Sequence, residues 1–189
     1  IKWLSRTICA TDAYQRESRP QSSASEKPFT ANIAQRLRGD QLFNSLVTAL
    51  EIDETRANLQ QSSGRFPRNY GRRNTPRAAF VGIFGYDPSD PRDMVSGSIP
   101  QTLAMMNMSR IDEAIQQKGS QTMLGRLLRE TSDDDARTVD LYLRVLSREP
   151  TDKELTNAQV YIASVGTVSE AYEDLLWALL NSSEFLHRR

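Results

Sequence analysis

Apolar residues recur at three- and four-residue steps along most of the chain, and this spacing predicts helices. The repeat is clearest in three successive segments near the C-terminus, residues 132–149, 151–166 and 168–187. Pro150 and Gly166 separate these segments, and Thr151 and Glu154 have the spacing of a helix capping box. Because short turns bring successive amphipathic helices together, we expect a C-terminal three-helix core.

The last of these segments carries apolar residues on two sides. Trp177, Asn181 and Phe185 follow one another at i, i+4 and i+8, opposite a stripe made of Tyr172, Leu175, Leu176, Leu179 and Leu180. Since Trp and Phe side chains usually lie in a core, the pattern predicts a helix wrapped on both flanks. The amides of Asn181 and Asn107 would then anchor loops by hydrogen bonds. The alternative is that Trp177 and Asn181 face solvent and bind a ligand such as a sugar.

Shorter helices are predicted before this core. Apolar faces occur in residues 38–52, 76–85, 98–117 and 121–130, and a helical stripe opens the chain. Pro76 suits a first helical turn, and Asp40, Ser98 and Ser132 are the expected N-caps. The inward faces are expected to include Leu103, Met106, Ile111 and Ile115 in one helical segment. In the helix that follows Ser132 they are expected to include Ala136, Val139, Leu143 and Leu146.

The fold class that follows is all-α: an irregular multi-helix domain of roughly seven to nine helices with long loops. Residues 16–38 and 62–98 are polar or rich in Pro, Gly and Arg, and we expect them to form an irregular arm and loops. No strand pairing is needed. Residues 1–189 are interpreted as a single helical domain cut from the C-terminal end of a larger protein, because the sequence opens without Met and already in a helical pattern.

The composition of the chain limits the kinds of functional site that it can form. The 24 basic and 24 acidic residues balance, so no overall field draws the chain to nucleic acid, and we expect no nucleic-acid partner. One cysteine and one histidine exclude a disulfide framework and a Cys- or His-based metal site. The consecutive acids at 133–135 point about 100° apart on a helix, which suits helix-start electrostatics better than a metal site. We therefore predict no catalytic residue, metal or cofactor, and no membrane span.

The strongest cluster of candidate binding residues lies in the irregular middle of the chain. Arg65, Arg68, Arg72 and Arg73 are interleaved with Tyr70 and free of acids. Arginines near an aromatic ring can bind phosphate or an acidic polymer. The favoured interpretation is a surface connector whose guanidinium groups pair with carboxylates on neighbouring helices. Together with Trp177 and Asn181, these five residues complete the set of candidate binding residues.

Several segments, taken in order, resemble one known family. They are "TDAYQRES", "RLRGDQLFNSLVTAL", "SIPQTLAMMN", "SREPTDKEL" and "DLLWALLNSSEFLHRR". This set is similar to the planctomycete C-terminal domain of unknown function, found in large planctomycete proteins that often also carry a cytochrome-c-like haem domain. The resemblance implies a helical, extracytoplasmic module, periplasmic or at the cell surface, whose partners are the other domains of its parent polypeptide and polysaccharide. It supplies no catalytic residues, and because the chain has no C-x-x-C-H motif, any haem belongs to another part of the parent.

These observations predict a non-catalytic structural or interaction module. One alternative is a carbohydrate-binding or carbohydrate-processing accessory domain, which requires an exposed Trp177 or Tyr70 beside carboxylates in a groove. A second is a docking adaptor for a haem-c domain that acts through the arginines of residues 65–77. A third is a hydrolase whose site is shared with another part of the parent.

Overall fold

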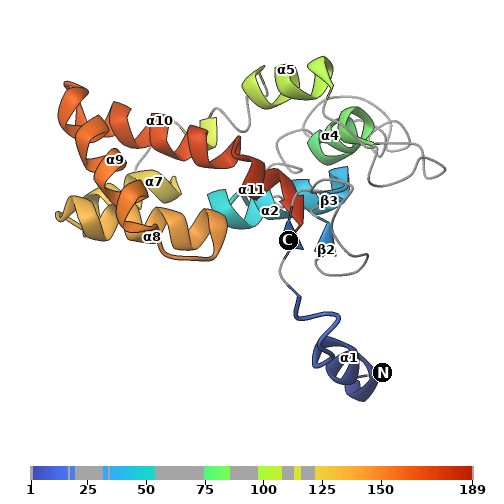
Figure 1. Ribbon diagram of the computed structural model, residues 1–189. Coiled ribbons are helices and arrows are strands. Elements are labelled where there is room, and N and C mark those ends of the chain that lie inside the picture. Colours follow the sequence, from blue (N-terminus) through green and yellow to red (C-terminus); the bar gives the residue numbers. More distant parts are fainter. Residues whose placement is uncertain are drawn as a thin grey trace, which may run out of the picture.

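The chain is mostly helical, as predicted (Figure 1). The computed structural model describes residues 2–16, 18–19, 32–33, 35–53, 75–85, 98–107, 113–115 and 122–188. The helices are α1 (Lys2–Cys9), α2 (Gly39–Leu50), α4 (Pro76–Phe84), α5 (Ile99–Asn107), α7 (Met123–Glu130), α8 (Asp134–Leu146), α9 (Asp152–Ser164), α10 (Val168–Leu180) and α11 (Ser183–Leu186). The two-residue strands are β1 (Ser18–Arg19), β2 (Asn32–Ile33), β3 (Gln35–Arg36) and β4 (His187–Arg188).

The predicted C-terminal core is present and is formed by α8, α9 and α10, with α7 beside them (Figure 1). The leucine stripe of α10 is its centre, because the side chains of Tyr172, Leu176 and Leu180 are fully buried. The Thr151–Glu154 capping box forms as expected and begins α9. α9 contributes little to the core, since only its side chains Ala158 and Ile162 are buried.

The same buried cluster continues into a second group of helices, α2 and α4. Phe80 is fully buried and stacks on Phe84, with ring centroids 4.1 Å apart. Gly39 lets α2 begin close against α4, because a Cβ atom there would lie 3.0 Å from the Cβ of Phe84. Pro76 occupies the first turn of α4, as predicted, and the Thr75 hydroxyl caps it.

The final segment is not one helix to residue 187, which corrects the sequence prediction. α10 ends at Leu180, and the Ser182 hydroxyl then accepts the N–H of Phe185 to begin the short helix α11. A serine hydroxyl offers the backbone an N-cap in place of a continuing helix, which explains the break. The chain then runs into β4, which pairs antiparallel with β3, so strand pairing does occur here and between β1 and β2.

Two helix starts differ from the predicted N-caps. α2 begins after Arg38, and Asp40 lies within its first turn, where it forms an ion pair with Arg38 at 2.8 Å. α8 begins after Asp133, whose carboxylate accepts the N–H of Ala136 at 2.9 Å, so Ser132 is not the cap. A carboxylate beside the positive helix end competes well with a serine hydroxyl, which accounts for the shift at α8.

Two predicted inward faces differ from those observed. In α8 the buried residues are Thr138, Leu141, Tyr142 and Val145, whereas Ala136 and Leu143 are exposed and Val139 and Leu146 only half-buried. In α5, Gln101 and Met105 are buried and Leu103 and Met106 are exposed. Further along that predicted face Ile115 is buried, as expected, and Ile111 lies outside the described residues. The cause of both differences is a buried polar residue in each helix that satisfies its own hydrogen bonds: the Thr138 hydroxyl donates to the carbonyl of Asp134, and the Gln101 amide to that of Ile83.

Neighbouring positions on α10 offer a test of this arrangement. Leu176→Ala removes a fully buried side chain and should lower the free energy of unfolding by about 2–5 kcal/mol. Trp177→Ala changes the next residue, which is 40% exposed, and should cost roughly 1 kcal/mol or less. Urea unfolding followed by circular dichroism measures both values. Equal losses for the two variants would contradict the one-sided burial of α10.

Candidate functional site

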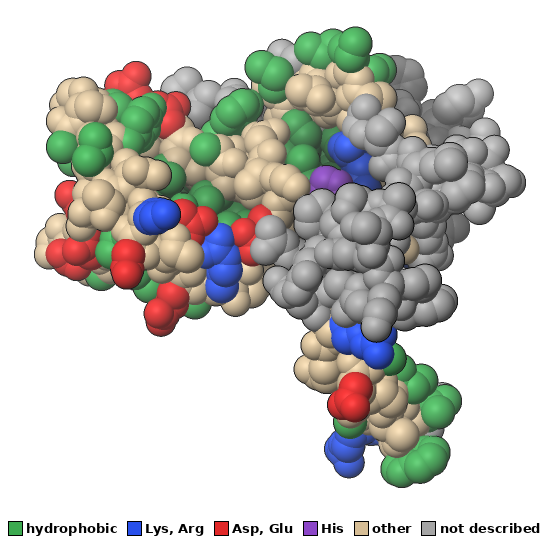
Figure 2. Space-filling view, viewed as in Figure 1, with side chains coloured by type: hydrophobic (Ala, Val, Ile, Leu, Met, Phe, Trp, Pro, Cys, Tyr) green, Lys and Arg blue, Asp and Glu red, His purple; other side chains and the backbone are tan. Residues whose placement is uncertain are grey.

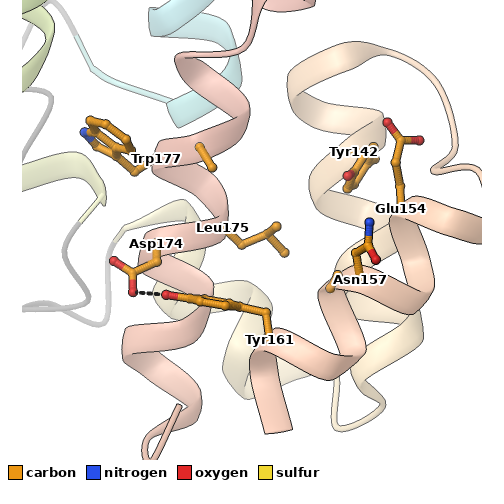
Figure 3. A pocket seen from close by; sticks show the side chains of 9 residues that line it. Tyr142, Glu154, Asn157, Tyr161, Asp174, Leu175 and Trp177 are labelled. Carbon is orange, nitrogen blue, oxygen red and sulfur yellow. Dashed lines mark hydrogen bonds between the residues drawn. The ribbon is translucent and has the colours of Figure 1, made fainter. Parts of the chain in front are cut away.

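A groove of about 530 Å³ opens between α9 and α10, beside α8 (Figure 3). Its floor is apolar and includes the side chains of Leu175, Ala158 and Ala178. Polar and aromatic side chains stand around this floor: Tyr142, Glu154, Asn157, Tyr161, Asp174 and Trp177. Small residues on both helices leave the space that larger side chains would fill.

The groove exists because α9 and α10 diverge from the turn that joins them. Ala171 and Ala178 lie on the same side of α10, two helical turns apart. Ala171, near the turn, is fully buried, whereas Ala178 is exposed and lines the groove. In Figure 3, Tyr161 reaches α10 while Asn157 and Glu154, earlier on α9, stand away from it. The groove is therefore the wedge between two splayed helices.

Trp177 is not buried in a second core face, which corrects the prediction of a helix wrapped on both flanks. Its side chain is 40% exposed, whereas Phe185 is buried as expected, at 6%. The break after α10 moves Phe185 onto a different helix, so the three-residue stripe is not continuous. In Figure 3 the indole projects from the side of α10 opposite to Leu175. Trp177 lines the groove only from its edge.

The side-chain amide of Asn181 does not form the predicted hydrogen bond to a loop. It donates to the carbonyl of Trp177, 2.8 Å away, and so closes the end of its own helix. This local bond satisfies a carbonyl that the helix end would otherwise leave unpaired. The side chain of Asn107 lies outside the described residues.

A tyrosine–aspartate pair bridges the groove at its narrow end. The Tyr161 hydroxyl of α9 donates to Oδ2 of Asp174 on α10, with the two oxygens 2.7 Å apart (Figure 3). This hydrogen bond to the neighbouring carboxylate raises the pKa of the Tyr161 hydroxyl above its ordinary value. The phenol therefore stays protonated and keeps bridging the two helices over the physiological pH range.

Glu154, at the wide end, is held by a guanidinium group. Both terminal nitrogens of Arg148 donate to its carboxylate at 2.8 Å, and the backbone N–H and hydroxyl of Thr151 donate to the same carboxylate. The hydrogen bonds from Arg148, with those from Thr151, lower the pKa of Glu154 from 4.5 to about 2. Glu154 is therefore a fixed negative charge at the rim and is not suited to donate a proton.

Arg148 also connects this end of the groove to the final helix. It donates two hydrogen bonds to the carboxylate of Glu184 on α11, at 2.8 and 2.9 Å, and lies 5.6 Å from the ring centre of Tyr142. These two carboxylates raise the pKa of the Arg148 guanidinium. One arginine thus ties α8, α9 and α11 together at the wide end of the groove.

The structure does not place the four candidate arginines or Tyr70. Arg65, Arg68, Tyr70, Arg72 and Arg73 lie outside the described residues, so the structure does not bring them to the groove or separate them from it. From the same stretch, Arg77 is described. Its guanidinium donates to the side-chain oxygen of Asn44 and lies 5.1 Å from the ring centre of Phe43.

The acids at the start of α8 act at the helix start, as predicted. Asp133 caps the helix, Asp134 pairs with Arg137 at 2.9 Å, and Asp135 accepts a hydrogen bond from Gln159. Within the part of the chain that the structure describes, no group of three or more His, Cys, Asp or Glu residues is placed to hold a metal ion. The described helices also include none that is long and apolar enough to cross a membrane.

Sequence reasoning missed most of the residues around the groove: Tyr142, Glu154 in its role at the rim, Asn157, Tyr161 and Asp174. One signal was available. Tyr161 and Trp177 are large aromatic residues that fall off the apolar faces of two successive helices. Both are about two-fifths exposed in the structure. Aromatic residues off the core face of adjacent helices thus mark the shared groove.

Comparison of the chain with models of known protein families gives no match, and searches of curated proteins and of solved structures also give none. The geometry of the groove therefore carries the functional argument.

The Arg148–Glu154 pair has a measurable pH signature. Because the folded pKa of Glu154 is lowered, its stabilisation is complete above about pH 4.5 and is lost as the pH falls toward 2. Glu154→Gln should lower the free energy of unfolding by about 1–2 kcal/mol at pH 7, after allowance for partial exposure of the pair, and by much less near pH 2. Urea unfolding from pH 7 to 2 measures this difference.

Glu149→Gln is the matched control, because this exposed side chain is close in sequence and carries the same charge. The control should keep the pH dependence of the unmodified protein. A constant difference between Glu154→Gln and the unmodified protein at every pH would show that the charge of Glu154 does not contribute.

Proposed function

We propose that this chain is a non-catalytic interaction module that holds a partner segment in the groove between α9 and α10. The observation that carries the proposal is the combination of an open apolar floor with a rim of fixed negative charge. The floor is formed by Leu175, Ala158 and Ala178, and the charge by Asp174 and by Glu154, whose charge Arg148 partly offsets. Since Glu154 is held ionised and Asp174 accepts a hydrogen bond from Tyr161, both acids serve recognition better than proton transfer.

The charge of the surrounding helices defines the partner. Residues 152–180 contain five carboxylates and one lysine, which gives a net charge of −4. An apolar floor between two splayed helices accepts the side-chain ridge of a third helix. The partner that fits is therefore an amphipathic segment, best a helix, that carries apolar residues on one side and Lys or Arg beside them.

Carbohydrate binding is the second candidate, and Trp177 favours it. Trp177 and Tyr161 are 40% and 41% exposed and line the groove together with Asp174. Aromatic faces stack on sugar rings, and carboxylates accept sugar hydroxyls. It ranks second because the Tyr161 hydroxyl and Asp174 already bond each other, and because the indole points away from the apolar floor (Figure 3). These side chains do not together enclose one sugar ring.

The wider setting belongs to the same proposal and rests on sequence resemblance alone. The similarity of the closing segment, residues 174–189, and of the earlier segments to the planctomycete C-terminal domain supports a module of a larger, extracytoplasmic protein. Other domains of that protein would then be natural partners. Docking of a haem-c domain through the arginines of residues 65–77 stays part of this setting.

Fluorescence of Trp177 tests the proposal directly. The chain has two tryptophans, so Trp3→Phe leaves the indole at the groove rim as the only one. A cationic amphipathic helical peptide should change its emission saturably, and salt should weaken the effect because screening reduces the charge attraction. The same peptide with its Lys residues replaced by Glu should have no effect. Hexasaccharides of β-1,4-linked glucose, xylose and N-acetylglucosamine test the second candidate.

Ala178→Arg should abolish the response to the cationic peptide, since it places a bulky positive group in the groove. Ala163→Arg is the matched control, because Ala163 is exposed on α9 and does not line the groove. A saturable response to a hexasaccharide, lost in Ala178→Arg, would favour the carbohydrate candidate instead. No response to either class of ligand would overturn the proposed site.

A further inference from the structure

The N-terminal helix presents a second amphipathic surface that matches the groove. α1 has no buried residue, and its side chains Trp3, Leu4 and Ile8 are 73%, 54% and 50% exposed. In Figure 1 the helix stands apart from the body of the molecule, and Figure 2 shows apolar side chains gathered along one edge of it. Because an eight-residue helix is marginal in water, such a stripe gains stability from packing against another surface.

The charge of α1 is opposite to that of the groove. Lys2 and Arg6 are the only charged residues between residues 2 and 9, so the helix carries a charge of +2. The helices that form the groove carry −4 over residues 152–180. Both basic side chains are exposed. Arg6 lies next to Trp3, three residues along the helix, whereas Lys2 lies on the side of α1 away from Leu4. α1 therefore has the two properties that the proposed function requires of a partner segment.

The dimensions also agree. At 1.5 Å per residue, α1 is about 12 Å long and α9 and α10 are each about 20 Å long. The apolar stripe of α1 can therefore lie along the wedge between the two longer helices, with Arg6 toward the acidic rim. Trp3, Leu4 and Ile8 supply the large side chains that the small residues of the groove floor leave room for.

We propose that α1 of one copy of this chain docks in the groove between α9 and α10 of a second copy. This inference rests on the proposed function and names the partner of that site. If each copy places its α1 in the groove of the other, the contact closes with two-fold symmetry and gives a dimer. The interface is small, so the dissociation constant should be on the order of 10 µM.

Sedimentation equilibrium of the full chain over a range of concentrations tests the inference. The unmodified chain should pass from monomer to dimer as its concentration rises past about 10 µM. Leu4→Asp should leave it monomeric at about 100 µM, because a carboxylate would lie on the apolar floor beside the acidic rim. Ser5→Asp, the adjacent position away from the stripe, adds the same charge and should retain the dimer. Since α1 has no buried residue, neither change should alter the thermal unfolding of the body.

A mixing experiment tests the direction of the contact. Leu4→Asp disrupts the apolar stripe of α1 and leaves the groove unchanged. Ala178→Arg blocks the groove and leaves α1 unchanged. Each variant alone should be monomeric, whereas an equal mixture at about 1 mM of each should form a heterodimer with one intact contact, which is weaker than the two-contact dimer. A mixture that stays monomeric would overturn the inference, and so would dimers that persist in both variants alone.

The outcomes separate this inference from the proposed function. A chain that is monomeric at about 100 µM, but whose Trp177 emission still responds to the cationic peptide, contradicts docking between copies and leaves the groove as an interaction site. A chain that neither dimerises nor responds to the peptide contradicts both. Salt should weaken the dimer, because ion screening acts on the attraction between α1 and the rim.

Discussion

One row of side chains along α10 determines the arrangement of the C-terminal helices. Tyr172, Leu176 and Leu180 are fully buried, and α7, α8, α9 and α11 all contact this helix. The ring of Tyr172 can be buried because its hydroxyl donates to the backbone carbonyl of Asp134, 3.0 Å away. Burial raises the pKa of this hydroxyl to about 12. Because that side of α10 packs in the core, the opposite side of the helix forms one wall of the groove.

A set of ion pairs fixes α9 at the wide end of the groove. α9 buries only two side chains, so hydrogen bonds at its first turn contribute much of its anchoring. Arg148, just after the end of α8, links Glu154 at the start of α9 to Glu184 in α11. Since α9 is fixed at its start by Arg148 and at its end by the turn into α10, its middle need not pack closely on α10. Because α9 is anchored at its two ends, the apolar floor between α9 and α10 stays exposed.

Local sequence signals predicted the elements well. The leucine spacing of α10, the Thr151–Glu154 capping box and Pro76 at the start of α4 each depend on residues within one or two turns. Predictions failed where a side chain formed a hydrogen bond to the nearby backbone that apolar periodicity does not reveal. Thr138 is buried because its hydroxyl finds the carbonyl of Asp134, and helix periodicity alone counts it as a surface residue. The break after Asn181 arises because the Ser182 hydroxyl offers a cap, which competes with continuation of the helix.

The groove lay beyond the reach of sequence patterns for a related reason. It depends on the angle between α9 and α10, and Ala171 and Ala178 have the same side-chain chemistry and the same face but opposite burial. Trp177 was a candidate from the sequence, and it is exposed because it lies on the side of α10 away from the buried row. Glu154 was recognised as a cap, and its second role as a rim charge comes from the fold.

The most direct test of this account compares these two alanines. In a Cys9→Ser background, which has no other thiol, Ala171→Cys and Ala178→Cys place a single cysteine on the same side of α10. A maleimide reagent should label the cysteine at 178 at nearly the rate of an unfolded peptide, and the one at 171 only when the core opens. Equal protection of the two thiols would mean that α9 closes over α10 along its whole length and that no groove exists.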